Sequence, residues 1–164
     1  MKTIVCVILV SLLVFPGITS CLSNRPDQDD VIGGAYLSEQ EELTKVINAI
    51  VKDAEEVNIE GLKSAHLESV KFSKFGPRTF ERQDVASTNE TEAAFFGSIS
   101  NYKQEVRDLK IDVFDDVAVA TYYPYVSYVL NGEEIKGSGR QTFVFVHTQH
   151  GWKLVHEHGT PKQK

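Results

Sequence analysis

Two histidines near the C-terminal end have the type and spacing most suggestive of chemistry. His156 and His158 are two positions apart, and on a β-strand such residues share a face. Paired imidazoles could bind a metal ion or transfer protons. A metal usually needs a third ligand, however, and no spacing brings His66, His147 or His150 to the pair. We therefore predict no metal and no cofactor, and interpret the pair as polar residues of the fold's wall or of a pocket.

Arg140 and Thr142 form a second candidate cluster, because they also share a face on a strand. If the following turn pairs position 148 with position 152, Thr142 lies opposite His158, and Arg140 then lies on the same side as His156. The guanidinium could bind a carboxylate or a carbonyl group. The alternatives are a structural cluster or an ion pair with a helix carboxylate, and a one-residue change of register would separate the cluster.

Tyr123 and Tyr125 are candidates on a long segment rich in Val and Tyr. A tyrosine hydroxyl can polarise a carbonyl when a carboxylate removes the proton, but residues 117–130 contain no Asp or Glu. Packing or a contact between subunits is therefore the first interpretation of these aromatics. The last candidate is Glu157, which lies between the two histidines.

A targeting segment precedes the elements that must position these residues. Lys2 is followed by an apolar run at 4–15, which is typical of a signal peptide and shorter than the roughly 20 residues of a membrane-spanning helix. The sequence Ile18-Thr19-Ser20-Cys21 resembles the bacterial lipobox, which implies removal of residues 1–20 and lipidation of Cys21. We expect an exported protein of the cell envelope that contacts the membrane only through this lipid, with a secreted or periplasmic protein as the alternative.

Composition limits the possible partners and the organisation of the chain. The net charge is −6 and no Lys/Arg cluster is present, which argues against nucleic acid as a partner. Residues 21–37 are polar and contain a Gly33-Gly34 pair, so we expect a flexible tether there. The single domain is then expected over residues 38–160.

Helical periodicity is strongest at the start of this domain. Apolar residues recur at helical spacing over residues 38–57, and Ser38 and Glu41 match a capping box. Asn58 is a suitable N-cap for a short second helix, and a third helix is expected at 89–98. The segment between them is expected to be irregular, because a Gly-Pro pair interrupts it.

The remainder of the chain predicts an antiparallel meander. Four strands are expected, at 103–114, 117–130, 133–147 and 152–158. Asp115-Asp116 and Asn131-Gly132 are suited to tight hairpin turns. The Gly137-Ser138-Gly139 run is expected to form a bulge that bends the sheet.

The closing hairpin also resembles a known family. Gly139-Arg140-Gln141-Thr142 followed by an apolar strand, a turn and Gly151-Trp152-Lys153-Leu154-Val155-His156-Glu157-His158 resembles the end of SnoaL-like domains. Asp116-Val117-Ala118-Val119 is similar to their strand entry. The resemblance spans about residues 38–160 and implies the α+β fold of the NTF2-like superfamily, which includes ketosteroid isomerase. Such a cone-shaped half-barrel packs three N-terminal helices on a curved antiparallel sheet of four or more strands, around a pocket.

Fold resemblance alone does not assign chemistry, and two classes of function remain open. The first is a binding or association module for a small apolar or carboxylate-bearing ligand, which we favour because no acid–base pair is evident. The alternative is a small isomerase, dehydratase or cyclase acting on an apolar carbonyl compound. The enzyme requires His156 or Glu157 to point into an enclosed apolar cavity with a polar partner in reach. A homodimer through the outer sheet face is also expected.

Overall fold

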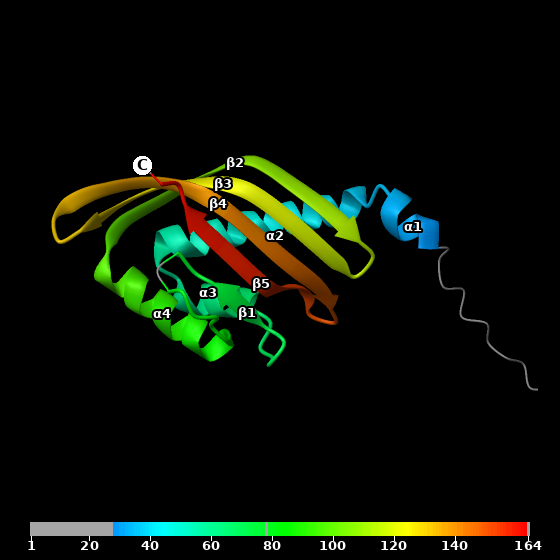
Figure 1. The fold of residues 1–164 in the computed structure, drawn as a ribbon, viewed down its shortest axis with the longest axis horizontal. Helices are drawn as coiled ribbons and strands as arrows, with labels where there is room; N and C mark the ends of the chain where they lie inside the picture. Colours follow the sequence, from blue (N-terminus) through cyan, green and yellow to red (C-terminus); the bar gives the residue numbers. More distant parts are fainter. Residues whose placement is uncertain (1–27, 78, 164) are drawn as a thin grey trace, which may run out of the picture.

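The computed structural model describes residues 28–77 and 79–163, with side chains from residue 31. The expected signal peptide, Cys21 and the first part of the tether lie outside these residues. The elements are α1 (Gln28–Gly33), α2 (Leu37–Glu56), α3 (Ile59–Ala65), β1 (Ser73–Phe75), α4 (Val85–Ser98), β2 (Ser100–Phe114), β3 (Val117–Leu130), β4 (Glu133–Thr148) and β5 (Gly151–Pro161). The α+β half-barrel with a sheet of four or more strands is confirmed (Figure 1), and β1 adds a fifth strand to the expected meander.

The sheet has the order β1-β5-β4-β3-β2 and is antiparallel except where β1 runs parallel to β5. Its first two hairpin turns are those that the sequence predicts. Asp115, Asn131 and Gly132 all adopt positive φ, at 59°, 53° and 84°, a backbone conformation that Asn, Asp and Gly tolerate best. The meander therefore follows from turn chemistry.

Bulges curve the sheet at positions that the sequence does not mark. The register of β2 against β3 shifts near Asn101 and again near Asp108, where both residues have positive φ. In β5 the register against β4 shifts at Val155. The bulge expected at Gly137–Gly139 is wrong, because β3 and β4 pair in one register across it. Gly139 instead permits close approach, since a Cβ there would lie 2.6 Å from the Thr160 carbonyl oxygen.

Helix α2 fills the concave side of the sheet, which curves over it (Figure 1). Leu43 and Ile47 are completely buried and belong to the same core as Phe145 and Leu154. This packing follows from the helical apolar spacing of the sequence. The capping box expected at Ser38 is wrong, because the helix begins one residue earlier and the Ser38 hydroxyl donates to Glu39.

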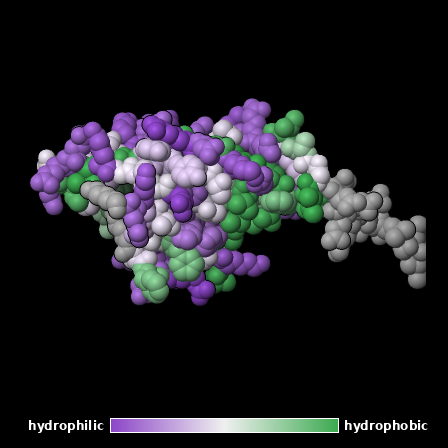
Figure 2. Space-filling model, turned by 45° about the horizontal axis from the view of Figure 1, so that its top comes forward, coloured by the Kyte–Doolittle hydropathy of each residue, from purple (hydrophilic) through white to green (hydrophobic). Residues whose placement is uncertain are grey.

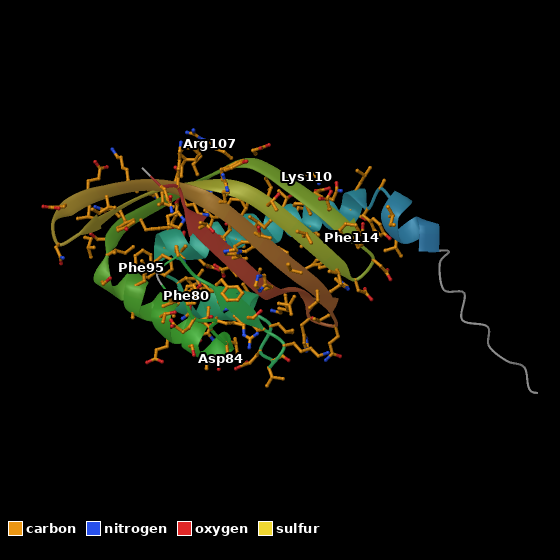
Figure 3. The ribbon with its side chains drawn as sticks, viewed as in Figure 1. Phe80, Asp84, Phe95, Arg107, Lys110 and Phe114 are labelled. Carbon is orange, nitrogen blue, oxygen red and sulfur yellow. The ribbon has the colours of Figure 1, made fainter. Side chains whose placement is uncertain are left out.

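The next two helices pack against each other and against the β5 and β1 edge of the sheet. Asn58 caps α3 as predicted, since its side chain accepts a hydrogen bond from the Gly61 amide. Helix α4 begins four residues before the expected start, because the Asp84 carboxylate accepts from the Ser87 amide at 2.8 Å. Asp84 marks that start in Figure 3. The two helices place their inner faces opposite β1 and β5.

Two segments expected to lack regular structure contain short elements. Strand β1 lies within the segment expected to be irregular, and α1 within the expected tether. No helix in the described part of the chain is both long and apolar enough to cross a membrane. Figure 2 shows hydrophobic surface toward the end that carries α1, where Ile32, Leu37 and Phe114 are exposed.

Candidate functional site

A cavity of about 250 Å³ lies inside the cone, between the concave face of the sheet and helices α2, α3 and α4. Its apolar wall comes from Ile50, Val51, Ala54, Leu62, Phe95, Phe96, Phe143 and Leu154. Its polar side includes His66, Lys74, Glu92, Gln104, Tyr122, Gln141 and Glu157. An apolar cavity with a few converging polar groups is the usual form of a small-molecule site.

A buried ammonium group joins two carboxylates at the polar side. Lys74 Nζ lies 2.6 Å from Glu92 Oε1 and 2.9 Å from Glu157 Oε1. The Lys74 side chain is 10% exposed and the carboxylates 18% and 14%. Burial alone would lower the pKa of Lys74, but the charges of Glu157 and Glu92 outweigh it and raise this pKa above its ordinary value. Lys74 is therefore a permanent cation that holds both carboxylates in place.

His66 completes the cluster from the side opposite Lys74. Its ring is buried against Phe72, with ring centroids 4.9 Å apart. Nδ1 donates to the Asn89 side-chain oxygen at 2.8 Å, so Nε2 of the neutral ring has a free lone pair. Nε2 lies 4.0 Å from Glu92 Oε2 and 3.9 Å from Glu157 Oε2.

Four elements supply these side chains. Lys74 and Glu157 are register partners in the parallel β1–β5 pair, so their side chains share the inner face. Asn89 and Glu92 are three residues apart on α4 and therefore project from the same side of that helix. His66 follows α3, beside Leu154 of β5. The cluster thus forms only when residues far apart in the sequence come together.

Tyr122 connects the charged cluster to the aromatic wall. Burial, followed by the charge of Glu157, raises the pKa of the Tyr122 hydroxyl above its usual value, so this hydroxyl stays protonated at neutral pH. Gln104 lies 3.5 Å from it and accepts a hydrogen bond from the Tyr102 hydroxyl at 2.6 Å. A row of hydroxyl and amide groups therefore crosses the cavity.

Of the residues predicted for the site, the cavity contains only Glu157. On β5, His156 and His158 alternate with Glu157 and contact β1 from the outer face of the sheet. Ser73 Oγ lies 2.9 Å from His156 Nδ1, and Phe75 makes edge contacts with both imidazole rings. These histidines therefore lie in the wall of the fold and do not line this cavity.

Arg140 and Thr142 also lie outside this cavity, because they alternate with the inward Gln141. Arg140 is exposed and lines an adjoining, more open groove of about 340 Å³. The predicted pairing of Thr142 with His158 is present, although the turn closes between Thr148 and Gly151 rather than at position 152. The extra residue at Val155 compensates for this difference, so that β4 and β5 pair in the predicted register from His156 onward.

Tyr123 and Tyr125 lie away from the cavity as well. They are 45% and 41% exposed, and the Arg107 guanidinium lies 3.9 Å above the Tyr125 ring. Figure 3 shows Arg107 on the outer side of β2. The tyrosine of β3 that lines the cavity is Tyr122, which was not among the predicted site residues.

Sequence reasoning missed most of the cluster. Lys74 lies in the segment expected to be irregular, and Glu92 was one of many helix carboxylates. The signal that could have found Glu92 is its position four residues before Phe96, on the apolar side of α4. Lys74 lies two positions after the buried Phe72 and shares its face, but no local pattern predicted a strand there.

Comparisons with known proteins identify the family and the fold. The SnoaL-like domain family matches residues 43–161. An NTF2-like superfamily protein from Salmonella enterica is similar in structure, with a TM-score of 0.73 and 22% identity over 79% of this chain and 95% of that one. A protein from Streptomyces avermitilis, whose name proposes a dehydratase of the NTF2-like family, has a TM-score of 0.71 and 18% identity over 77% and 98%.

An NTF2-like protein of unknown function from Pseudomonas putida is also similar, with a TM-score of 0.67 and 15% identity over 77% of this chain and 89% of that one. No curated protein matches the chain. These structural likenesses are below 25% identity and establish the fold, whereas the family match covers most of the chain and establishes membership. The chain belongs to the SnoaL-like domain family, and its fold is that of NTF2-like proteins.

Proposed function

We propose that this domain binds a small, uncharged organic ligand in the cavity inside the cone. The observation that carries the proposal is the cavity itself, which combines an apolar wall with polar groups on one side. Its volume of about 250 Å³ is close to the lower end of the roughly 300–1,000 Å³ of typical ligand pockets. The ligand is therefore compact, of the size of a one- or two-ring compound.

The charges of the cavity select among ligands. Two carboxylates, Glu92 and Glu157, are opposed by one ammonium group, Lys74. This balance disfavours the carboxylate-bearing ligand and favours a neutral compound that offers hydrogen-bonding groups to Gln141 and Tyr122. The aromatic side chains Phe95 and Phe96, which contact each other at 5.1 Å between centroids, supply the surface for an apolar body.

Ligand titration of adjacent β4 variants tests this proposal. Gln141 lines the cavity and Thr142 does not, so Gln141→Leu and Thr142→Val form a matched pair. Neutral phenols, quinones and small ketones are titrated against both variants, with matched carboxylates as competitors. We expect Gln141→Leu to weaken binding about tenfold, which corresponds to one hydrogen bond of roughly 1.4 kcal/mol. Equal effects in the two variants would exclude the cavity as the binding site.

A small enzyme is the second candidate, and Glu157 favours it. This carboxylate points into the cavity with Lys74 at 2.9 Å and Gln141 at 3.3 Å, which meets the requirement set for catalysis on a carbonyl compound. An isomerase, dehydratase or cyclase would exchange the α-protons of a bound ketone with solvent. Mass spectrometry in deuterated water measures this exchange, and its absence for every ketone that binds would leave a binding module.

We also propose that the domain is held at a bacterial cell envelope through lipid on Cys21. The support is the similarity of Ile18-Thr19-Ser20-Cys21 to a lipobox after an apolar run. Cys21→Ala should move the protein from the membrane to the soluble fraction and abolish labelling by a fatty acid. A mutant that stays in the membrane with its label would contradict the anchor.

A further inference from the structure

The two carboxylates of the buried cluster each have one oxygen directed at Lys74 and one at His66. Oε1 of Glu92 and of Glu157 bonds Lys74, whereas Oε2 of each lies about 4 Å from His66 Nε2. That distance is too long for a hydrogen bond. One ligand atom from each of the three residues lies within 4.8 Å of the others. We propose that His66, Glu92 and Glu157 bind a divalent transition metal ion, for which Zn²⁺ is the probe.

The spacing suits an ion placed between the three atoms. Zinc binds imidazole nitrogen and carboxylate oxygen at about 2.0–2.2 Å, so two ligands of a tetrahedral site are roughly 3.4 Å apart. The His66 nitrogen lies 4.0 and 3.9 Å from the two carboxylate oxygens, and small side-chain rotations would shorten these distances to the required value. A nitrogen ligand beside two carboxylates suits zinc and its neighbours rather than magnesium or calcium, which prefer oxygen alone.

Each of the three ligand residues is fixed by an outer partner, as in established metal sites. Asn89 accepts the Nδ1 proton of His66 and so directs the Nε2 lone pair at the carboxylates. Lys74 holds both Glu residues, and Gln141 donates to Glu157 Oε1 at 3.3 Å. This arrangement distinguishes the cluster from a group of acidic residues that repel one another at a surface.

The charge balance leaves room for a cation. With His66 neutral, two carboxylates and one ammonium give the cluster a net charge of −1 inside the protein. A divalent ion would change this charge to +1 while using one lone pair from each of the three ligand residues. Three protein ligands also leave the fourth position of the ion to water or to a molecule in the cavity.

The metal site shares the polar side of the proposed ligand cavity but does not depend on an organic ligand. Metal titrations without organic compounds test the ion alone, and ligand titrations in the presence of a chelator test the proposed function alone. Failure of one therefore leaves the other intact.

Calorimetric titration of the metal-free full chain with ZnCl₂ tests the proposal. We expect one ion per chain. His66→Gln should weaken binding at least a hundredfold, and Asn89→Ala, which leaves all three ligands in place, about 10–100-fold. The matched control is His156→Gln on the outer face of the same sheet, which should leave the affinity unchanged.

Cobalt provides a second measurement that needs no variant. Co²⁺ bound by nitrogen and oxygen should show visible d–d absorption without sulfur-to-metal charge transfer, and Zn²⁺ should displace it. Absence of one-to-one binding, loss of binding in His156→Gln, or a charge-transfer band from cysteine would each overturn the proposal. A protonated His66 that bridges the carboxylates would give the first of these results.

Discussion

On the inner face of the β4–β5 hairpin, Glu157 lies against a buried lysine and a buried imidazole, and Gln141 donates to it. On the outer face, His156 and His158 contact Ser73 and Phe75 of β1. Both faces carry polar residues, and from residue type the outer face is the more suggestive of chemistry. Burial of the inner residues, however, costs free energy of desolvation, and several partners keep these residues in place. Burial together with several polar partners, rather than residue type alone, is therefore the feature that distinguishes the inner cluster as the candidate site.

The largest expected difference between the two faces is the effect of a lysine substitution on the free energy of unfolding. Lys74→Met removes the cation between Glu92 and Glu157 and leaves two buried carboxylates without a counter-charge, which should cost about 3–5 kcal/mol of unfolding free energy. The control is Lys110→Met on the outer side of β2 (Figure 3), where the partner is the surface residue Asp112. The control should stay within about 0.5 kcal/mol.

Urea denaturation at neutral pH measures both lysine variants. Equal stabilities would mean that the interior near Lys74 admits enough water to solvate the carboxylates. Added Zn²⁺ sharpens the test. An ion at the carboxylates should raise the free energy of unfolding of Lys74→Met by more than that of the wild type.

The histidines provide a smaller contrast. His66→Gln removes the hydrogen bond to Asn89 from a buried site and should cost about 1–3 kcal/mol. His158→Gln, on the exposed side of the β4–β5 hairpin, should change the free energy of unfolding by less than about 0.5 kcal/mol. Thermal unfolding in the presence of a chelator measures the pair, and a larger loss in His158→Gln would reverse the assignment of the two faces.

The sequence predicts the frame of this molecule well and the interior cluster poorly. The long helix expected at 38–57 is α2 at Leu37–Glu56. It could be predicted because the apolar residues at helical spacing are the ones that the helix buries. The hairpin turns follow equally from local chemistry. Strand β1, by contrast, is three residues long. Apart from a single bridge between Lys74 and Gln83, it pairs with β5, some eighty positions later, so no local pattern marks it. The inward direction of Lys74 depends on that distant pairing.

The smallest expected effect is on the outer face. Tyr125→Leu removes the stacking of the ring with Arg107 and should cost about 0.5–1 kcal/mol, the usual value of an exposed cation–π pair. We propose that this face pairs two copies of the chain, as its exposed Tyr123 and Tyr125 suggest. In that case the same substitution should weaken the dimer by 2 kcal/mol or more, as roughly expected of a buried aromatic at an interface.

Sedimentation of the wild type and of Tyr125→Leu separates these outcomes. A wild type that remains monomeric at tens of micromolar, on the order of the concentration at which specific interfaces of standard size are occupied, would contradict the dimer. It would leave the comparison between the two faces unchanged.

Val155 divides β5 into two parts with different alternation. Before it, the even-numbered Trp152 and Leu154 are buried, and after it the odd-numbered Glu157 faces the cavity. Deleting Val155 would make the strand regular without exchanging its faces, so evolution can gain or lose one residue here and keep the cavity. Relatives of different length at this point are therefore misaligned if positions are counted continuously from the tryptophan, because an imidazole of the outer wall would then be matched to a cavity carboxylate.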